Sequence, residues 1–278
     1  MIELPESYVL ASQIKLATAG KVIRRVFANA HPHAFATFNG DPGFYESMLC
    51  GKEILDASLG SGSTGGSHVE ILCGDMALII STPIRYHAPG EKTAPKHQLL
   101  IEFDDSSSMS CTVQMWGAIF CLSAEDITKP GSPCRLIPSP LDDAFNIDYF
   151  FNLMQNAKPA LSAKAFLTSE YRIPGLGNGV MHDILFNARI HPKRRIESFS
   201  QNNCERIFHS VKSTLRYMAE RGGRDTEKDL YGNWGGYKTI LTSKSSGMPC
   251  RNCNEHIIKE MYLGGNIYFC PECQPISE

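Results

Sequence analysis

The sequence lacks a long hydrophobic run, and this absence limits where the protein can work. No stretch of about 18 apolar residues occurs in the 278-residue chain, so no membrane-spanning helix is expected. The segment from Met1 to Glu6 has no basic region followed by an apolar one, so no secretory signal peptide is expected. We therefore expect a cytoplasmic protein that makes no contact with a membrane.

An excess of positive charge is also missing. Lysine and arginine total 27 against 29 aspartate and glutamate residues, which gives a net charge of −2. Proteins that bind nucleic acids usually carry a broad basic surface, so any contact with a polyanion must depend on a local cluster of basic residues. The 42% hydrophobic content is sufficient for one large domain or two modest ones with their own cores.

Cysteine, in contrast, is plentiful, with ten residues. Six of them are scattered and mostly lie in apolar surroundings. Because no secretion signal is present, we interpret these six cysteines as buried thiols in a reducing compartment rather than as disulfides. These six are Cys50, Cys73, Cys111, Cys121, Cys134 and Cys204.

The other four cysteines form two C-x2-C pairs, Cys250 with Cys253 and Cys270 with Cys273, separated by sixteen residues. Each pair lets two thiolates reach one ion from a tight turn, and the intervening segment suits a β-hairpin. Two disulfides or four idle thiols are the alternatives. The spacing predicts a zinc ribbon with one structural Zn²⁺ ion, which would supply much of the folding energy of so small a module.

The first half of the chain has a pattern typical of an antiparallel β-sandwich or barrel. A helical stripe of apolar residues covers 6–19, and short β-like runs follow, separated by turns rich in glycine, serine and aspartate. The glycine-rich segment 60–66 lacks the lysine and the following helix of a phosphate-binding loop, so we predict a flexible hairpin loop there. The clearest runs are 22–23, 68–72, 76–80, 98–103 and 111–122.

The second half is helical. Proline-rich segments at 129–133 and 138–140 predict a linker, and helices are expected over 142–156, 162–167 and 200–221. Ser200 can cap the longest helix, and Gly222 and Gly223 can end it. The fold class is therefore α+β, with a sandwich over 1–133, a helical domain over 134–240 and the zinc ribbon over 241–278.

A glycine-rich turn over 175–179 leads into a helix with an apolar face. Tight glycine turns let backbone N–H groups approach a phosphate, and Asn178 could add a side-chain donor. Lys193, Arg194 and Arg195 follow the helix and form a local basic cluster. From these residues alone, an ordinary glycine turn with solvated charges is an equally good interpretation.

Several segments together, in order along nearly the whole chain, resemble the formamidopyrimidine-DNA glycosylase and endonuclease VIII family. The resemblance implies a helix–two-turn–helix domain and a monomeric clamp on double-stranded DNA that contains a damaged base or an abasic site. It also implies that the enzyme flips the damaged base, excises it and, in a bacterium, works at the nucleoid. The segments are 3–6, 51–52, 175–192, 222–223, 235–237 and the closing Cys-Pro-Glu-Cys-Gln of 270–274.

The resemblance also implies catalytic residues, although the chain departs from the family at one of them. In the family an N-terminal amine, normally of a proline, attacks the sugar, and the adjacent glutamate acts as acid and base. Ile2 replaces that proline, and methionine is usually not removed before isoleucine, so Ile2 would offer only an amide nitrogen. Glu3 is then the main catalytic candidate beside Met1, Ile2 and Lys52, and β-lyase activity is expected to be altered or absent. A non-catalytic paralogue that binds damaged DNA is the alternative.

The remaining correspondences concern contact with DNA. The resemblance implies phosphate contacts by Lys52, Asn178 and the cluster 193–195, and it places His97 at a further contact. Met115 and Trp116 stand where the family fills the gap left by the flipped base, although both residues would equally fit the core of a strand. Gly265 stands at the ribbon tip, where the family has an arginine.

Overall fold

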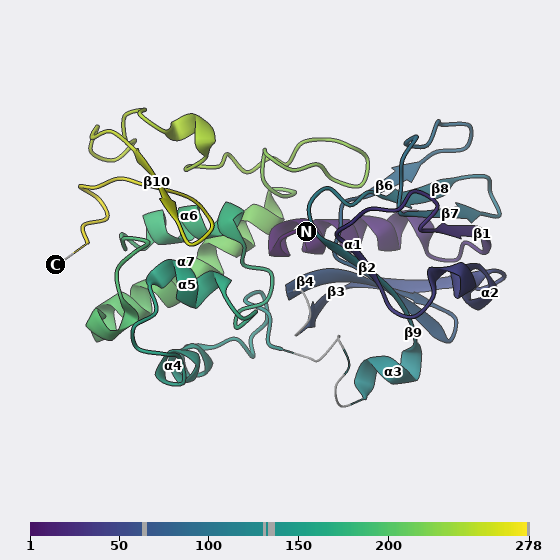
Figure 1. Ribbon diagram of the computed structural model, residues 1–278, viewed down its shortest axis with the longest axis horizontal. Coiled ribbons are helices and arrows are strands. Elements are labelled where there is room, and N and C mark those ends of the chain that lie inside the picture. The colour runs from purple at the N-terminus through teal and green to yellow at the C-terminus, as the bar shows by residue number, and fades with distance from the viewer. Residues whose placement is uncertain (63–65, 130–131, 133–136, 277–278) are drawn as a thin grey trace.

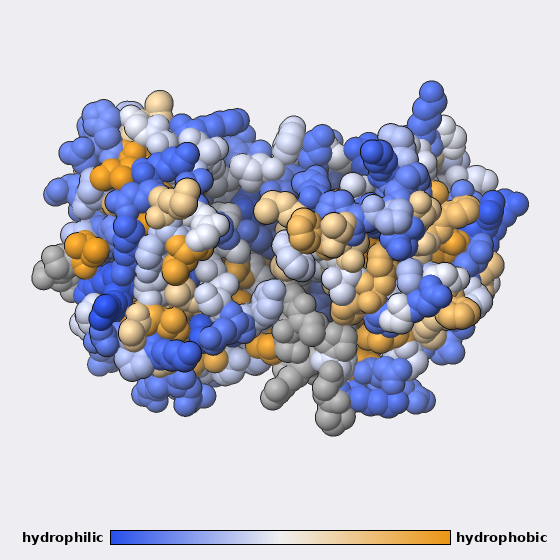
Figure 2. All heavy atoms as spheres, viewed as in Figure 1, coloured by the Kyte–Doolittle hydropathy of each residue, from blue (hydrophilic) through white to orange (hydrophobic). Residues whose placement is uncertain are grey.

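The computed structural model describes residues 1–62, 66–129, 132 and 137–276. A strand-rich half and a helical half lie side by side, and α1 (Leu4–Thr18) extends along the strand-rich half from the junction between them (Figure 1). Hydrophilic residues cover much of the visible face, and the widest apolar patch lies on the strand-rich side (Figure 2). This arrangement confirms the predicted α+β fold class.

The strand-rich half is a sandwich of a four-stranded and a five-stranded sheet. The first has the order β1 (Ile23–Ala28), β7 (Leu99–Phe103), β8 (Ser108–Cys111) and β6 (Ile84–His87). The second has the order β2 (Ala36–Phe38), β9 (Gly117–Ser123), β5 (Met76–Ile80), β4 (Gly66–Cys73) and β3 (Ile54–Gly62). Every pairing among the described strands is antiparallel except that of β2 with β9, which is parallel. Two short helices, α2 (Tyr45–Leu49) and α3 (Ala124–Thr128), flank the strands.

The prediction of one strand over 111–122 is wrong. β8 ends at Cys111 in one sheet and β9 begins at Gly117 in the other. Between them the N–H of Val113 donates to the side chain of Gln98 (2.7 Å) instead of to a neighbouring strand. The connection 112–116 is therefore a loop between the two sheets.

Helix α1 begins two residues earlier than predicted. Pro5 lies in its first turn, where a proline loses no intrahelical hydrogen bond, and Glu3 is its N-cap residue. Leu10 and Ile14 are fully buried against the sandwich, and each such side chain contributes roughly 1.5–3 kcal/mol to folding. The helix thus fixes the position of Glu3 at its own N-terminus.

The helical half consists of α4 (Ile147–Gln155), α5 (Ala163–Thr168), α6 (Asn178–Asn187) and α7 (Gln201–Glu220). Helix α4 is shorter than predicted because Asn146 caps it, accepting from the N–H of Tyr149 (2.9 Å). Ser200 caps α7 as predicted, and Gly222 and Gly223 follow it with φ angles of +75° and +92°. Among the described residues, no helix combines the length and apolar character needed to cross a bilayer.

The C-terminal ribbon is a hairpin of β10 (Ile258–Tyr262) and β11 (Gly265–Phe269). Leu263 and Gly264 form its two-residue turn, and both have positive φ angles, as a type I′ turn requires. Tyr268 and Cys270 pack against Phe186 of α6, which joins the ribbon to the helical half.

The two predicted domain boundaries, at 133/134 and 240/241, remain predictions. At the first of them, most of the predicted linker 129–133, together with Cys134, lies outside the described residues. Residues 63–65, at the tip of the predicted hairpin loop, also lie outside the described residues. The segment 225–234 returns from the helical half to the sandwich, where Leu230 joins the core. Tyr86 donates its N–H to the carbonyl of Leu230 (2.9 Å), so the two halves share this segment.

Candidate functional site

The first residues of the chain connect the two halves. The side chain of Ile2 lies in the sandwich core, and its N–H donates to the carbonyl of Ser81 (3.0 Å). The side chain of Leu4 lies in the helical core, and its N–H donates to the carbonyl of Gly175 (3.0 Å). Glu3, between them, is therefore held at the junction by both halves.

The carboxylate of Glu3 lies at the N-terminus of α6. It accepts hydrogen bonds from the N–H groups of Gly179 (3.0 Å) and Val180 (2.8 Å), which no carbonyl of the helix can satisfy. A Cβ at residue 177 would lie 2.3 Å from Oε1 of Glu3, so only glycine at 177 permits this approach. The predicted glycine turn therefore receives a carboxylate of this same chain.

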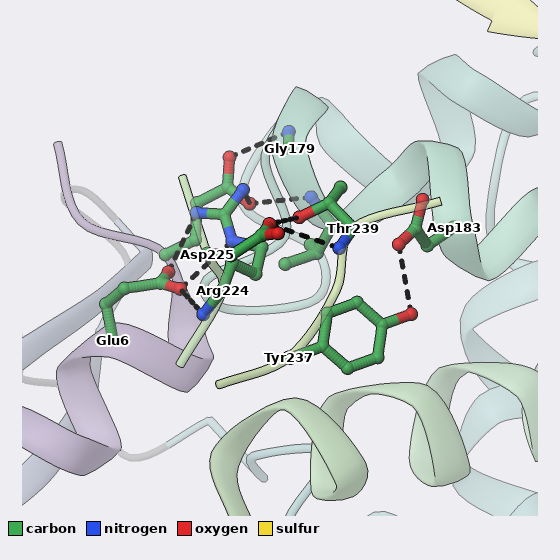
Figure 3. Close-up of polar contacts among 9 residues, drawn as sticks. Glu6, Gly179, Asp183, Arg224, Asp225, Tyr237 and Thr239 are labelled. Atoms are coloured by element: carbon green, nitrogen blue, oxygen red, sulfur yellow. Dashed lines mark hydrogen bonds and ion pairs between the residues drawn. The ribbon is translucent and has the colours of Figure 1, made fainter. Parts of the chain in front are cut away.

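Arg224 completes the arrangement (Figure 3). Its Nη1 lies 3.4 Å from Oε2 of Glu3, while its Nη2 and Nε donate to the carboxylate of Glu6 at 2.8 and 3.0 Å. Desolvation lowers the pKa of this buried guanidinium, but the nearby carboxylates of Glu3 and Glu6 outweigh it, and the pKa is raised. The sequence reasoning missed Arg224 and the role of Glu6, although Glu6 belongs to the N-terminal signature and Arg224 follows the Gly-Gly pair directly.

The α-amino group of Met1 lies close to the same site. Partial burial lowers its pKa, and the carboxylates of Glu227 and Glu3 oppose this shift. A lowered pKa increases the neutral, nucleophilic fraction of an amine near pH 7. The nitrogen of Ile2, in contrast, is an amide whose N–H is already donated to Ser81.

A cavity of about 430 Å³ opens beside Ile2, between the sandwich and the segment 225–234. Such a volume lies within the usual range for small-molecule sites. The cavity shows that the two halves together form a recess next to the chain's first residues. Its lining includes Ile2, Arg85, Gln114, Glu227 and Trp234.

Lys52 does not lie at this site. It lies just beyond the C-terminal end of α1, where Ile23 donates its N–H to the carbonyl of Lys52 and Gly20 donates its N–H to the carbonyl of Ile54 (both 2.9 Å). Since α1 has 15 residues, it separates Lys52 from Glu3 by roughly 20 Å. The ammonium group of Lys52 forms an ion pair with Asp75. We therefore exclude Lys52 from the catalytic site and from a phosphate contact beside Glu3.

The three residues of the basic cluster point to different partners. Lys193 forms an ion pair with Glu260 of the ribbon, and Arg195 forms one with Glu197 at 3.2 Å. Arg194 is buried and donates to Ser198 through Nε (3.2 Å) and Nη2 (3.1 Å). The expected joint contact of the three side chains with phosphate is corrected accordingly, because Arg194 belongs to the interior.

His97 is also buried. Its Nδ1 lies 3.0 Å from the carbonyl oxygen of Ala94, and its ring packs edge-on against that of His31 at 4.9 Å. These contacts fix the loop before β7. They leave little of the ring to contact DNA.

Met115 and Trp116 lie on the loop between β8 and β9 and are 72% and 56% exposed. Their alternative placement in a strand core is therefore wrong. The ring of Trp116 packs against that of Phe35 at 5.1 Å, which holds the indole at the surface. Gln114 of the same loop lines the cavity, so the exposed pair lies close to it.

Asn178, for which a phosphate contact is predicted, and Gly265 of the ribbon turn lie close together. Asn178 is exposed as the first residue of α6, and its Nδ2 lies 3.2 Å from the position that a Cβ of Gly265 would take. Lys164 of α5, which the sequence reasoning missed, has its Nζ 3.7 Å from the same position.

The four ribbon cysteines fit a zinc ion. Their sulfur atoms all lie within 4.8 Å of one another, with distances of 3.8 Å for Cys250–Cys273 and 3.4 Å for Cys253–Cys270. Zn–S bonds of about 2.3 Å in a tetrahedron place sulfur atoms about 3.8 Å apart. Backbone N–H groups at Asn252 and Cys273 point to the sulfurs of Cys250 and Cys270 (both 3.4 Å), as in a thiolate site.

Two buried side chains position the ribbon on α6. Asp183 accepts from the N–H groups of Ile240 and Leu241 (both 2.9 Å) and from the hydroxyl of Tyr237 (3.0 Å), the last contact being drawn in Figure 3. Gln274 donates to the carbonyl of Ile190 (2.9 Å). The hairpin turn is therefore held beside the N-terminal end of α6.

Comparison with known proteins agrees with this arrangement. Residues 136–229 match the formamidopyrimidine-DNA glycosylase H2TH domain. The formamidopyrimidine-DNA glycosylase of Acinetobacter baylyi is 30% identical over 205 residues, covering 72% of this chain and 74% of that protein. The enzyme of the same name from Heliobacterium modesticaldum is 27% identical over 286 residues, covering 99% and 100%.

Solved structures show the same fold. The MutM (FPG) protein of Thermus thermophilus superimposes with a TM-score of 0.79 at 21% identity, covering 98% of each chain. A Lactococcus lactis FPG variant in complex with DNA containing Fapy-dG gives a TM-score of 0.83 at 21% identity, covering 98% of this chain and 99% of that one. The sequence match with the Acinetobacter baylyi enzyme, supported by this shared fold, shows that the chain belongs to the formamidopyrimidine-DNA glycosylase family.

Proposed function

We propose that this protein is a DNA glycosylase that flips a damaged base out of double-stranded DNA and excises it. The observation that carries the proposal is the position of Glu3. Contacts with both halves of the protein hold it in place, and it directly follows Ile2, which lines the cavity. Relatives that match 99% of the chain are named formamidopyrimidine-DNA glycosylases. Structural neighbours from Lactococcus lactis are complexes with DNA that contains Fapy-dG or an abasic site.

In this proposal the flipped nucleotide enters the recess between the sandwich and the segment 225–234. The carboxylate of Glu3 takes a proton from a water molecule as that oxygen attacks the sugar carbon. The bond between this carbon and the base breaks, and the base leaves with the bonding electrons and is then protonated. The N–H groups of Gly179 and Val180 hold the carboxylate in place during this step.

In this proposal the exposed residues of the loop 112–116 stabilise the DNA from which the damaged nucleotide has been flipped. Met115 and Trp116 extend from the surface next to the cavity and present apolar surface on which a base could stack. Zinc, bound by the four cysteines, holds the ribbon in its folded shape. The chain acts on DNA as a monomer in this proposal.

We further propose that β-lyase activity through Ile2 is absent. With Met1 in place, the Ile2 nitrogen is an amide, and its N–H is donated to Ser81. The α-amino group of Met1 is the remaining amine next to Glu3, and burial lowers its pKa.

A panel of duplexes, each with one damaged base, tests the proposal. Wild-type protein and Glu3→Gln are incubated with each duplex, with and without borohydride, and mass spectrometry identifies the N-terminal residue. We expect release of at least one base by wild type alone and no borohydride-trapped complex. Absence of base release across the panel, together with tight binding to abasic DNA, would instead support the non-catalytic paralogue.

A further inference from the structure

The charged side chains that line the cavity beside Ile2 differ in whether other groups of the protein already contact them. The two basic ones are contacted. Arg85 donates through Nη2 to Glu91 (3.2 Å), and the ammonium group of Lys228 lies 4.9 Å from the centre of the Trp234 ring. The charged lining residues are Glu6, Arg85, Glu227, Lys228 and Asp229.

The three acidic side chains of the lining differ in the same way. The carboxylate of Glu6 accepts from Nε and Nη2 of Arg224 (Figure 3). Asp229 accepts from the side chain of Gln13 (3.0 Å) and from two backbone N–H groups. The carboxylate of Glu227, in contrast, is exposed and has no hydrogen-bond or ion-pair partner among the residues that the structure describes. It is therefore available to a molecule in the cavity.

The backbone on both sides of Glu227 holds its side chain near the start of the chain. Its N–H donates to the carbonyl of Arg224, and its carbonyl accepts from the N–H of Gly235 (both 3.1 Å). Burial lowers the pKa of the Met1 amine, and Glu227 is the carboxylate that opposes this shift most strongly, ahead of Glu3. Glu227 and Glu3 therefore both lie close to the first residue of the chain.

Glu3 and Glu227 have different surroundings. Two backbone N–H groups and the guanidinium of Arg224 face the oxygens of Glu3. Desolvation raises the pKa of Glu227, although the charges of Arg224 and the Met1 amine oppose this shift. The carboxylates of Glu6 and Glu3 reinforce it. A base that fills the cavity would displace water and favour the neutral carboxyl group further. Two carboxyl groups in such different surroundings suit an acid and a base that act on one substrate.

We infer that Glu227 is the general acid that protonates the departing base, while Glu3 activates the water molecule. As the water oxygen bonds to the sugar carbon, the bond from this carbon to the base breaks, and its electron pair stays with the base. The carboxyl group of Glu227 gives its proton to a nitrogen or a carbonyl oxygen of the base, and Glu3 holds the proton from water. Exchange with solvent then restores both groups. The inference rests on the proposed function and adds the source of the second proton.

Single-turnover base release between about pH 5 and pH 9, with the duplex that wild type processes fastest, tests the inference. The wild-type rate should fall on the alkaline side as Glu227 loses its proton. Glu227→Gln should be slower by about 100-fold near pH 6 and should lack this fall, because an amide has no proton to give. Glu227→Asp keeps a carboxyl group and should show the fall again. Glu46→Gln changes an exposed carboxylate on α2 and should match wild type.

Binding to a duplex with a tetrahydrofuran abasic analogue separates catalysis from folding. This analogue has no base, so Glu227→Gln should bind it with wild-type affinity and unfold at the wild-type temperature. An equal loss of rate at every pH, or weaker analogue binding by both Glu227 variants, would overturn the inference. If wild type releases a base through Glu3 and Glu227→Gln keeps the wild-type pH profile, only the role of Glu227 fails. If wild type releases no base from any duplex, the proposed function fails as well.

Discussion

The guanidinium of Arg224 fills the space in which a side chain at Gly179 would begin. A Cβ at residue 179 would lie 1.6 Å from Nη1 of Arg224 and 3.1 Å from Oε1 of Glu3. Because residue 179 has no side chain, the guanidinium of Arg224 can contact the carboxylates of both Glu3 and Glu6. The first turn of α6 can at the same time donate backbone N–H groups to Glu3.

Gly179→Ala should therefore displace Arg224. Because Arg224 and Glu6 are both buried, separating them leaves uncompensated charges, and we expect a loss of about 3 kcal/mol or more in the free energy of unfolding. Urea unfolding measures the loss. Gly43→Ala, at an exposed glycine beside the Asp41 side chain, is the control and should change stability far less. Equal stability of both variants would show that the Arg224 contacts contribute little.

His68 should make stability depend on pH. It is buried on β4, its Nε2 has no hydrogen-bond partner among the residues that the structure describes, and burial lowers its pKa to about 4. The unfolded chain, with a histidine pKa near 6.5, then binds the proton more readily, so stability falls as the pH drops from 6.5 towards 4.

Between pH 7 and pH 5, His68 should account for a loss of about 2 kcal/mol in the free energy of unfolding. Urea titrations at both pH values should show a smaller drop for His68→Gln than for wild type, by about this amount. His256→Gln alters an exposed histidine and should keep the wild-type drop. Identical drops in all three proteins would exclude this role for His68.

The ribbon should require bound zinc in order to fold and to support DNA binding. Cys270→Ser removes one of four ligands, so we expect the zinc content to fall from one ion per chain to nearly none, with loss of duplex binding. Elemental analysis and fluorescence anisotropy measure the two effects. Cys50→Ser, which changes an exposed thiol outside the cluster, should retain both zinc and binding. Full zinc content in the Cys270 variant would contradict the four-cysteine site.

Trp116 should contribute stacking energy to DNA binding. Trp116→Ala should weaken binding to a duplex with an abasic analogue by about 1–3 kcal/mol, the range for one base on an aromatic ring. Anisotropy titrations test this value. Phe44→Ala removes another exposed ring of the sandwich and serves as the control. Comparable affinity in the two variants would show that Trp116 makes no such contact.

The features that the sequence predicted well depend on local chemistry. The zinc ligands follow from spacing within two turns, and α7 follows from its apolar period and its Ser200 cap. Glu3 was located by the resemblance of a contiguous segment, and the structure adds which groups hold it.

The features that could not be predicted from the sequence depend on contacts between residues far apart in the chain or on the direction of a side chain. Glu6 and Arg224 are 218 positions apart, and Lys164 and Tyr262 are 98 apart, so neither pair leaves a local pattern. Arg194 belongs to a basic run but turns into the interior, and Lys52 lies at the wrong end of α1. The break at 112–116 was hidden because the loop itself carries the apolar residues Val113, Met115 and Trp116, which continue the apolar pattern of β9.

Single-turnover base release by wild type and Glu3→Gln tests the central claim most directly. The duplex is the one that wild type processes fastest, and binding to an abasic analogue is measured in parallel. We expect the variant to lose at least about 100-fold in rate, as removal of an acid–base group does, while its affinity for the analogue stays close to that of wild type. Base release by Glu3→Gln at the wild-type rate would contradict the assignment of Glu3 as the catalytic carboxylate.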